Sequence, residues 1–244
     1  MIPIFSILSA FIAVVQFICF LKLYLSYQKT KTELIGEFSK VFLFLSLFWG
    51  FLALPKIVVN NLKLIQISLD LGLFFGFLTM AYFLFIPFRI YYHRIFPKSL
   101  FFTTVSLGIA ILIFNILNLK PAFIHFQNNF VFWSENRNLL VNIISGVLFS
   151  LIGFLAALFF YLGGLKSSEK KVRFRAFLIT ASIICIPLAS GIRFVFGSLF
   201  NIFTSTLVAF ILGIFSALFL TIAIFFFKPK TKKLFYKKIY GEEE

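Results

Sequence analysis

Three charged residues inside apolar stretches are the first candidates for chemistry in this sequence. Asp70 is the only full charge within the apolar run from Leu64 to Arg89, Lys56 follows Pro55 in an earlier run, and Arg193 lies in a later one. An ionisable side chain is costly to place inside a membrane-spanning segment, so each of the three is a functional candidate by default.

The three candidates are predicted to share one depth. At ~1.5 Å per helical residue, the separations from the basic end of each run are roughly 24, 28 and 27 Å, for the pairs Lys40–Lys56, Arg89–Asp70 and Arg175–Arg193. This places them near the far face of a hydrocarbon core about 30 Å thick. Side chains at one depth on three helices can meet, and we expect Asp70 to be stabilised by Lys56 or Arg193.

Two interpretations of this cluster stay open. In the first, an outward-facing pocket is floored by Asp70 with Lys56 or Arg193, and Trp133 and Glu135 contribute from the loop above it. In the second, the two cations extend along the helices to the outer headgroups, and Asp70 makes a single structural ion pair.

The loop above the cluster, Asn118–Asn138, is the one long connection. Its Gln127-Asn128-Asn129 segment separates two apolar-polar stretches, which is typical of a small β-hairpin lid. The alternative is a loop that lies on the headgroups with Trp133 as an interfacial anchor. His125 and Glu135 add ionisable groups, but they are too few for a metal site, because zinc requires three or four ligands.

Several function classes are not supported by the sequence. It contains no HExxH, GxSxG, P-loop or CxxC motif, so we expect no catalytic residues and no enzyme activity. We also expect no cofactor, because the seventh apolar segment, Ile202–Phe227, has no lysine for a retinal Schiff base.

The elements that carry these residues are predicted to be membrane helices. The chain has 244 residues, of which 61% are hydrophobic and 13% charged, too apolar for a soluble domain. Seven segments are long enough to span a bilayer, and open sheet edges do not occur in lipid. They are Ile4–Tyr24, Val41–Val59, Leu64–Arg89, Leu100–Leu117, Leu139–Leu165, Val172–Phe200 and Ile202–Phe227. We therefore predict an all-α bundle over residues 1–227, followed by a short basic tail over 228–244.

Charge asymmetry predicts the orientation. Eighteen of the 23 lysines and arginines fall on one side of the predicted bundle and five on the other, so the amino terminus is expected outside and the carboxyl terminus inside. The net charge of +15 is thus explained without nucleic acid. Residues expected to contact anionic lipid or a cytoplasmic partner are Lys170, Lys171, Arg173 and Arg175, with Lys232 and Lys233 in the tail.

The pattern resembles the seven-helix amino-terminal sensor region of many bacterial histidine kinases. The similar features are Trp49 in the second segment, Pro87 with Arg89, the Phe96-Pro97-Lys98 triplet, and the basic run Glu169–Phe177. The resemblance implies a sensor in a bacterial plasma membrane. Only seventeen residues follow Phe227, with no phospho-accepting or ATP-binding domain among them, so any signalling would require a separate cytoplasmic partner.

Three functions are consistent with these observations. The first is a non-enzymatic sensor or receptor-like module with an outward polar pocket. The second is a small transporter with three plus one plus three helices, in which Pro55-Lys56 and Pro187 with Arg193 are corresponding features. Charges near the outer face rather than the midplane favour the first. The third is a structural subunit of a larger complex.

Overall fold

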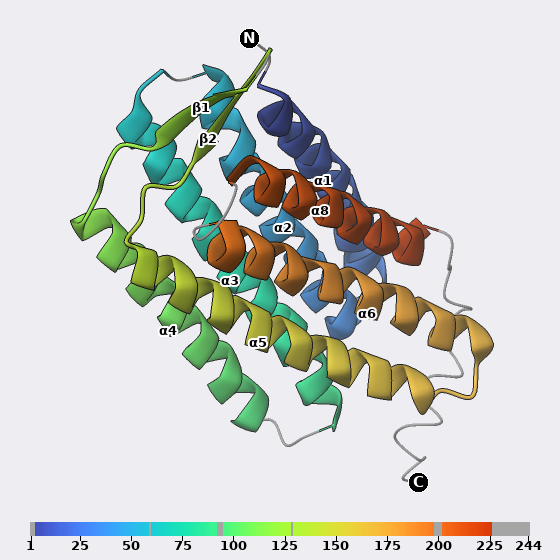
Figure 1. The fold of residues 1–244 in the computed structure, drawn as a ribbon. Coiled ribbons are helices and arrows are strands. Elements are labelled where there is room, and N and C mark those ends of the chain that lie inside the picture. The colour runs from blue at the N-terminus through green and yellow to red at the C-terminus, as the bar shows by residue number, and fades with distance from the viewer. Residues whose placement is uncertain (1–2, 59, 92–94, 128, 198–201, 226–244) are drawn as a thin grey trace, which may run out of the picture.

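The structure is a computed structural model, and it describes residues 3–58, 60–91, 95–127, 129–197 and 202–225. Seven helices in these ranges are long and apolar enough to cross a membrane. This confirms the predicted helical bundle of seven spans (Figure 1). The helices are α1 (Ile4–Thr30), α2 (Glu33–Val58), α3 (Leu62–Tyr91), α4 (Ile95–Leu117), α5 (Leu139–Leu165), α6 (Lys170–Ser190) and α8 (Ile202–Phe225), with a π-helical segment η1 (Gly191–Phe196) directly after α6.

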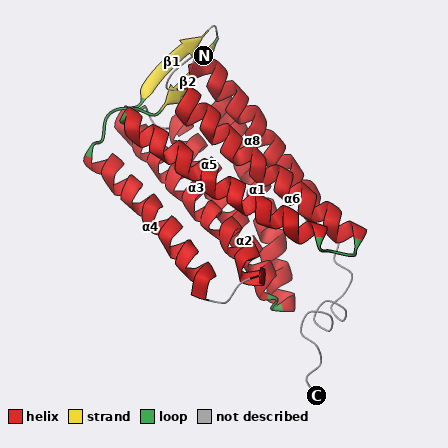
Figure 2. Ribbon diagram, turned by 60° about the horizontal axis from the view of Figure 1, so that its bottom comes forward, coloured by secondary structure: helices red, strands yellow, loops and turns green. Residues whose placement is uncertain are grey.

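Six of the helices form a closed ring, and α4 lies outside it. Neighbouring helices in the ring follow the order α1, α2, α3, α5, α6, α8, and α8 returns to α1, whereas α4 packs mainly on α3. In the most apolar stretch of each helix, 67% of the residues are buried in α3 but only 17% are buried in α4. Figures 1 and 2 both show α4 at the edge of the bundle. The ring therefore consists of two helix triplets, α1–α3 and α5–α8, joined through the peripheral α4.

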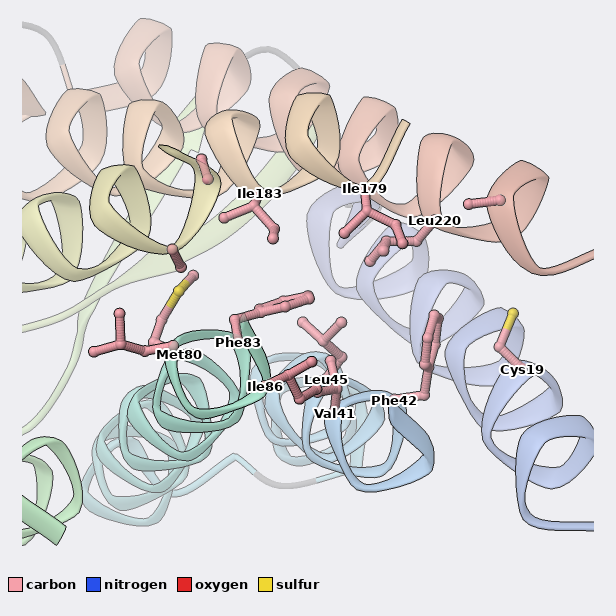
Figure 3. Packing of buried hydrophobic residues seen from close by; sticks show 14 of the residues in the cluster. Cys19, Val41, Phe42, Leu45, Met80, Phe83, Ile86, Ile179, Ile183 and Leu220 are labelled. Atoms are coloured by element: carbon pink, nitrogen blue, oxygen red, sulfur yellow. The ribbon is translucent and has the colours of Figure 1, made fainter. Parts of the chain in front are cut away.

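The main hydrophobic core fills the half of the ring that lies away from the β-strands. Its fully buried side chains come from all six ring helices, and they include Phe42, Phe83, Met80, Ile183 and Leu220. Figure 3 shows these side chains meeting between the helices. Large apolar side chains on the outer surface stay exposed, such as Phe11 at 68% and Leu151 at 62%, as expected for surfaces that face lipid.

A two-stranded antiparallel hairpin caps the opposite end of the ring. It is formed by β1 (Phe123–Gln127) and β2 (Phe130–Ser134), with Phe123 opposite Ser134 and Gln127 opposite Phe130. The hairpin alternative for the long loop is thus confirmed, and these two strands are an addition to the predicted all-α fold. We call this end, where α1 also begins, the hairpin end, and the other the basic end (Figure 1).

The largest differences from the predicted helix boundaries occur in two places. The first connection is short, because α1 continues to Thr30 and α2 begins at Glu33. Lys29 and Lys40, which fall between the first two predicted segments, therefore lie on helices. The sixth segment is not a uniform α-helix, because its last part is the π-helical η1. A π-helical turn inserts one residue into the helix and is frequent at functional sites.

Candidate functional site: a charged cluster above an apolar cavity

Asp70 accepts hydrogen bonds from three separate elements at the hairpin end. Arg137 donates from Nε to Oδ1 at 2.6 Å, Asn115 donates from Nδ2 to the same oxygen at 3.1 Å, and Gln66 donates from Nε2 to Oδ2 at 3.1 Å. The side chains of Asp70 and Arg137 are 0% and 1% exposed. A carboxylate buried this deeply requires a cation and additional donors, and all of them are present.

Local structure explains how these donors reach the carboxylate. Gln66 lies one helical turn before Asp70 on α3, so both side chains share a face. Arg137 also donates from Nη2 to the Leu69 carbonyl at 3.1 Å, which fixes its guanidinium against α3. The next residue, Asn138, caps α5 by accepting from the Leu140 amide at 2.9 Å. The α5 cap thus positions Arg137.

A second carboxylate, Glu135, connects the cluster to η1. Its side chain lies 3.0 Å from Arg193 Nη2 and 3.8 Å from Arg137 Nη1. Burial alone would raise the pKa of Glu135, but the positive charges of Arg193 and Arg137 outweigh burial and lower it to about 2. Glu135 is therefore ionised at neutral pH, and a chain of alternating charges runs from Asp70 through Arg137 and Glu135 to Arg193.

The observed partner of Asp70 differs from the expected one. The prediction named Lys56 or Arg193, whereas the ion pair is made by Arg137, in the connection between β2 and α5. Arg193 instead pairs with Glu135. Arg137 stands outside the apolar segments, so a count of helical depth could not select it.

Lys56 lies beside this chain of charges without joining it. It is 9% exposed and within electrostatic range of Arg193, Glu135 and Arg137. Among the described residues, no hydrogen bond or ion pair involves its ammonium group. Removing a cation from water without a partner is costly, so Lys56 is the one buried charge here whose stabilisation the described chain does not explain.

The hairpin residues predicted for the site are packed rather than open. Trp133 lies against the cluster of Leu52, Ile65, Leu69 and Ala122 above α2 and α3. His125 forms a 2.7 Å hydrogen bond with Ser134. Burial lowers the pKa of His125, which favours its neutral form. In the described ranges, no group of three metal-ligating side chains is found.

A mostly apolar cavity lies directly below the charges, inside the ring. Side chains from all six ring helices line it, and Glu135, Arg137 and Arg193 form its hairpin end; the cavity volume is about 80 Å³. Its lining on α3 runs from Leu69 to Met80, eleven residues or roughly 16 Å along the helix. Met80 and Leu220 belong to the hydrophobic core, so the core forms the floor of this main cavity.

A second cavity adjoins the same ion pairs. Glu135, Arg137, Arg193 and Phe194 line both cavities, and the second one also reaches Asn142 on α5 and the first turns of α8. The Glu135–Arg193 pair therefore borders both spaces.

Unpaired polar atoms mark both cavities. Five buried side-chain atoms have no hydrogen-bond partner in the described structure, and three of them belong to residues that line the cavities. They are Arg137 Nη1 and Gln16 Oε1 in the main cavity and Asn142 Oδ1 in the second. Buried polar groups are nearly always hydrogen-bonded, so each of these atoms indicates a position where water or a ligand completes the bonding.

The residues predicted to face a cytoplasmic partner lie at the basic end, remote from the cavity. Lys170, Lys171 and Arg173 are exposed on the first turn of α6, and Arg175 is partly buried. Arg173 donates to the Ser167 carbonyl at 2.9 Å. Lys232 and Lys233 lie outside the described residues.

In comparisons with known proteins, no protein-family model and no curated protein sequence matches this chain. The resemblance to histidine-kinase sensor regions is therefore still a prediction.

Proposed function

We propose that this chain is a non-enzymatic seven-helix membrane protein of the sensor or receptor type, whose ligand occupies the main cavity. The observation that carries the proposal is an apolar cavity closed on one side by the hydrophobic core and roofed on the other by ion pairs. A pocket with apolar walls and a few convergent polar groups is the usual form of a small-molecule site. The closed floor favours binding over passage through the membrane.

The sensor proposal includes an orientation of the chain in the membrane and a cytoplasmic surface that transmits the signal. Positive charge concentrates at the basic end, so this end is proposed to face the cytoplasm and the hairpin end to face outward. Ligand in the cavity contacts Arg193 on η1, which is continuous with α6. A change in α6 is then transmitted to the exposed Lys170, Lys171 and Arg173 and to a cytoplasmic partner. The resemblance to bacterial sensor regions supports this assignment and a bacterial plasma membrane.

Labelling of a cysteine deep in the cavity tests the one-sided site. Ala217 lines the cavity and is 8% exposed, so Ala217→Cys in a Cys19→Ala, Cys185→Ala background places a thiol there. We expect an anionic, membrane-impermeant methanethiosulfonate to label it from the hairpin side of oriented vesicles only. Ala110→Cys, on the exposed surface of α4, is the matched control and should not react. Labelling of Ala217→Cys from the basic side, or from neither side, would contradict the proposal.

Charge reversal at the basic end tests the exit of the signal. The variant Lys170→Glu, Lys171→Glu, Arg173→Glu should abolish co-purification of a cytoplasmic protein with the chain and leave labelling at Ala217→Cys unchanged. Lys98→Glu, exposed at the same end on α4, serves as the control. Loss of the same protein from both variants would show a general charge effect.

Transport is the second candidate, and one observation favours it. The cavity lies between two helix triplets with α4 outside the ring, which is the three-plus-one-plus-three arrangement expected from the sequence. A transporter would expose the cavity alternately to both sides, and labelling of Ala217→Cys from the basic side is the result that would establish it.

A further inference from the structure

We propose that the main cavity binds a single-chain amphiphile with an anionic head, placed with its head at Arg137 and Arg193, within the electrostatic range of Lys56, and its chain along the apolar walls. This inference rests on the proposed ligand site and names the chemical class of the ligand.

The charges around the cavity do not balance. The cluster contains three cationic side chains, Lys56, Arg137 and Arg193, and two carboxylates, Asp70 and Glu135. All five are buried or nearly so. Burial of a net positive charge next to lipid is unfavourable, and one anionic group supplied from outside the chain would neutralise it.

An unpaired donor lies where such a head would be held. Arg137 lines the cavity with a side chain that is 1% exposed, yet its Nη1 has no hydrogen-bond partner and lies 3.8 Å from Glu135. Lys56 does not line the cavity, but it is buried within electrostatic range of this guanidinium and adds to the positive potential there. A carboxylate or phosphate is the acceptor that matches a guanidinium and an ammonium group.

The apolar walls of the cavity indicate the chemistry of the remainder of the ligand. From Leu69 downward the lining is dominated by leucine, phenylalanine, alanine and glycine, with Trp49 on the α2 side. A small polar anion would leave these walls without a partner, whereas an alkyl chain buries against them. The roughly 16 Å from Leu69 to Met80 and the enclosure by six helices fit one chain rather than a two-chain lipid.

Trp49 provides a direct reporter for this site. The chain has two tryptophans, so Trp133→Phe leaves Trp49 as the only one. In phosphatidylcholine nanodiscs, 12-bromododecanoate and 12-bromododecyl phosphate should quench Trp49 fluorescence saturably. Both should act at concentrations about tenfold or more below those needed for neutral 12-bromododecanol. The carboxylate and phosphate probes distinguish a fatty-acid head from a phosphate head.

Lys56→Met is the decisive variant, because no described ion pair depends on Lys56. It should weaken quenching by the preferred anionic probe about tenfold and leave quenching by the alcohol unchanged. Lys63→Met, at an exposed position on α3 at the same end, should have no effect. Equal potency of alcohol and anions, an unchanged response in Lys56→Met, or quenching that never saturates would each overturn this inference. Labelling of Ala217→Cys does not depend on these probes. If the site exists but the ligand is of another class, Ala217→Cys is labelled from the hairpin side and the quenching results fail; if the site itself is wrong, the labelling fails.

Discussion

Arg137 and Asp70 form a buried ion pair across 67 positions of sequence, with Nε of the arginine 2.6 Å from Oδ1 of the aspartate. The pair joins α3 to the segment that starts α5. It therefore links the two helix triplets of the ring at the level of the cavity roof.

This link predicts strong coupling between the two residues. Asp70→Asn and Arg137→Gln should each lower the free energy of unfolding by about 3–5 kcal/mol, because either change leaves an uncompensated buried charge. The double variant should lose much less than the two losses added together, and denaturant unfolding in detergent micelles measures all three. Lys63→Gln, which removes an exposed cation from the same end, is the control. Additive losses would mean that the two side chains do not act as a pair.

The second carboxylate predicts a defined pH dependence. The folded protein holds the pKa of Glu135 at about 2, compared with the ordinary glutamate value of 4.5. Its ionised form therefore stabilises the fold fully above pH 4.5, and that contribution is lost as the pH falls from 4.5 through 2. In thermal unfolding scans at decreasing pH, Glu135→Gln should be less stable than wild type at pH 6 and converge with it near pH 2.

Glu33→Gln is the control for this experiment. Glu33 also pairs with an arginine, Arg89, but it is 72% exposed, so its pair contributes little. Its difference from wild type should stay small at all pH values. A constant difference between Glu135→Gln and wild type over the acidic range would contradict the assigned pKa.

Close packing at Gly213 predicts a steric effect on the cavity wall. A Cβ at this position would lie 2.6 Å from Trp49 Cη2, whereas a Cβ at Gly50 would meet nothing within 4 Å. Gly213→Ala should destabilise the protein by about 1–3 kcal/mol and shift the emission of Trp49 in the Trp133→Phe background. Gly50→Ala should be neutral or stabilising by about 0.5–1 kcal/mol, because alanine is favoured in a helix interior. Similar results for the two variants would show that the indole moves away freely.

The hairpin is predicted to depend on one buried aromatic side chain. Phe132 is 3% exposed and packs with Phe5 and Phe203, at ring-centroid distances of 5.8 and 5.5 Å. Phe132→Ala should cost about 3–5 kcal/mol and increase protease cleavage within the hairpin. Phe126, on the neighbouring strand, is 63% exposed, and Phe126→Ala should leave cleavage unchanged. Equal cleavage of the two variants would show that the hairpin is not held by this packing.

Much of the fold can be predicted from the sequence, because few backbone structures are stable in lipid. Runs of about twenty apolar residues predict membrane helices, and all seven are present. The π-helical η1 was not predicted, since an inserted residue within a continuous apolar run leaves no pattern in hydropathy. The ring order and the exclusion of α4 were also not predicted, because every helix in such a protein has an apolar surface.

The site was predictable only in part. Helical depth selected Asp70, Lys56 and Arg193, but pairing is decided by which side chains turn toward each other. Two missed partners had usable signals. Gln66 lies four residues before Asp70, on the same helical face. Asn115 lies seventeen residues after Lys98, roughly 26 Å along α4, which is the depth of the three charges.

The ion pair between Asp70 and Arg137 also constrains biosynthesis. Translation delivers the aspartate 67 residues before the arginine, so α3 reaches the insertion machinery before the cation that pairs with its carboxylate has been made. The helix must either stay with the insertion machinery until the start of α5 has been synthesised, or enter the membrane with Asp70 protonated and lose that proton later. Stable insertion of α3 thereby depends on synthesis of the residues that begin α5.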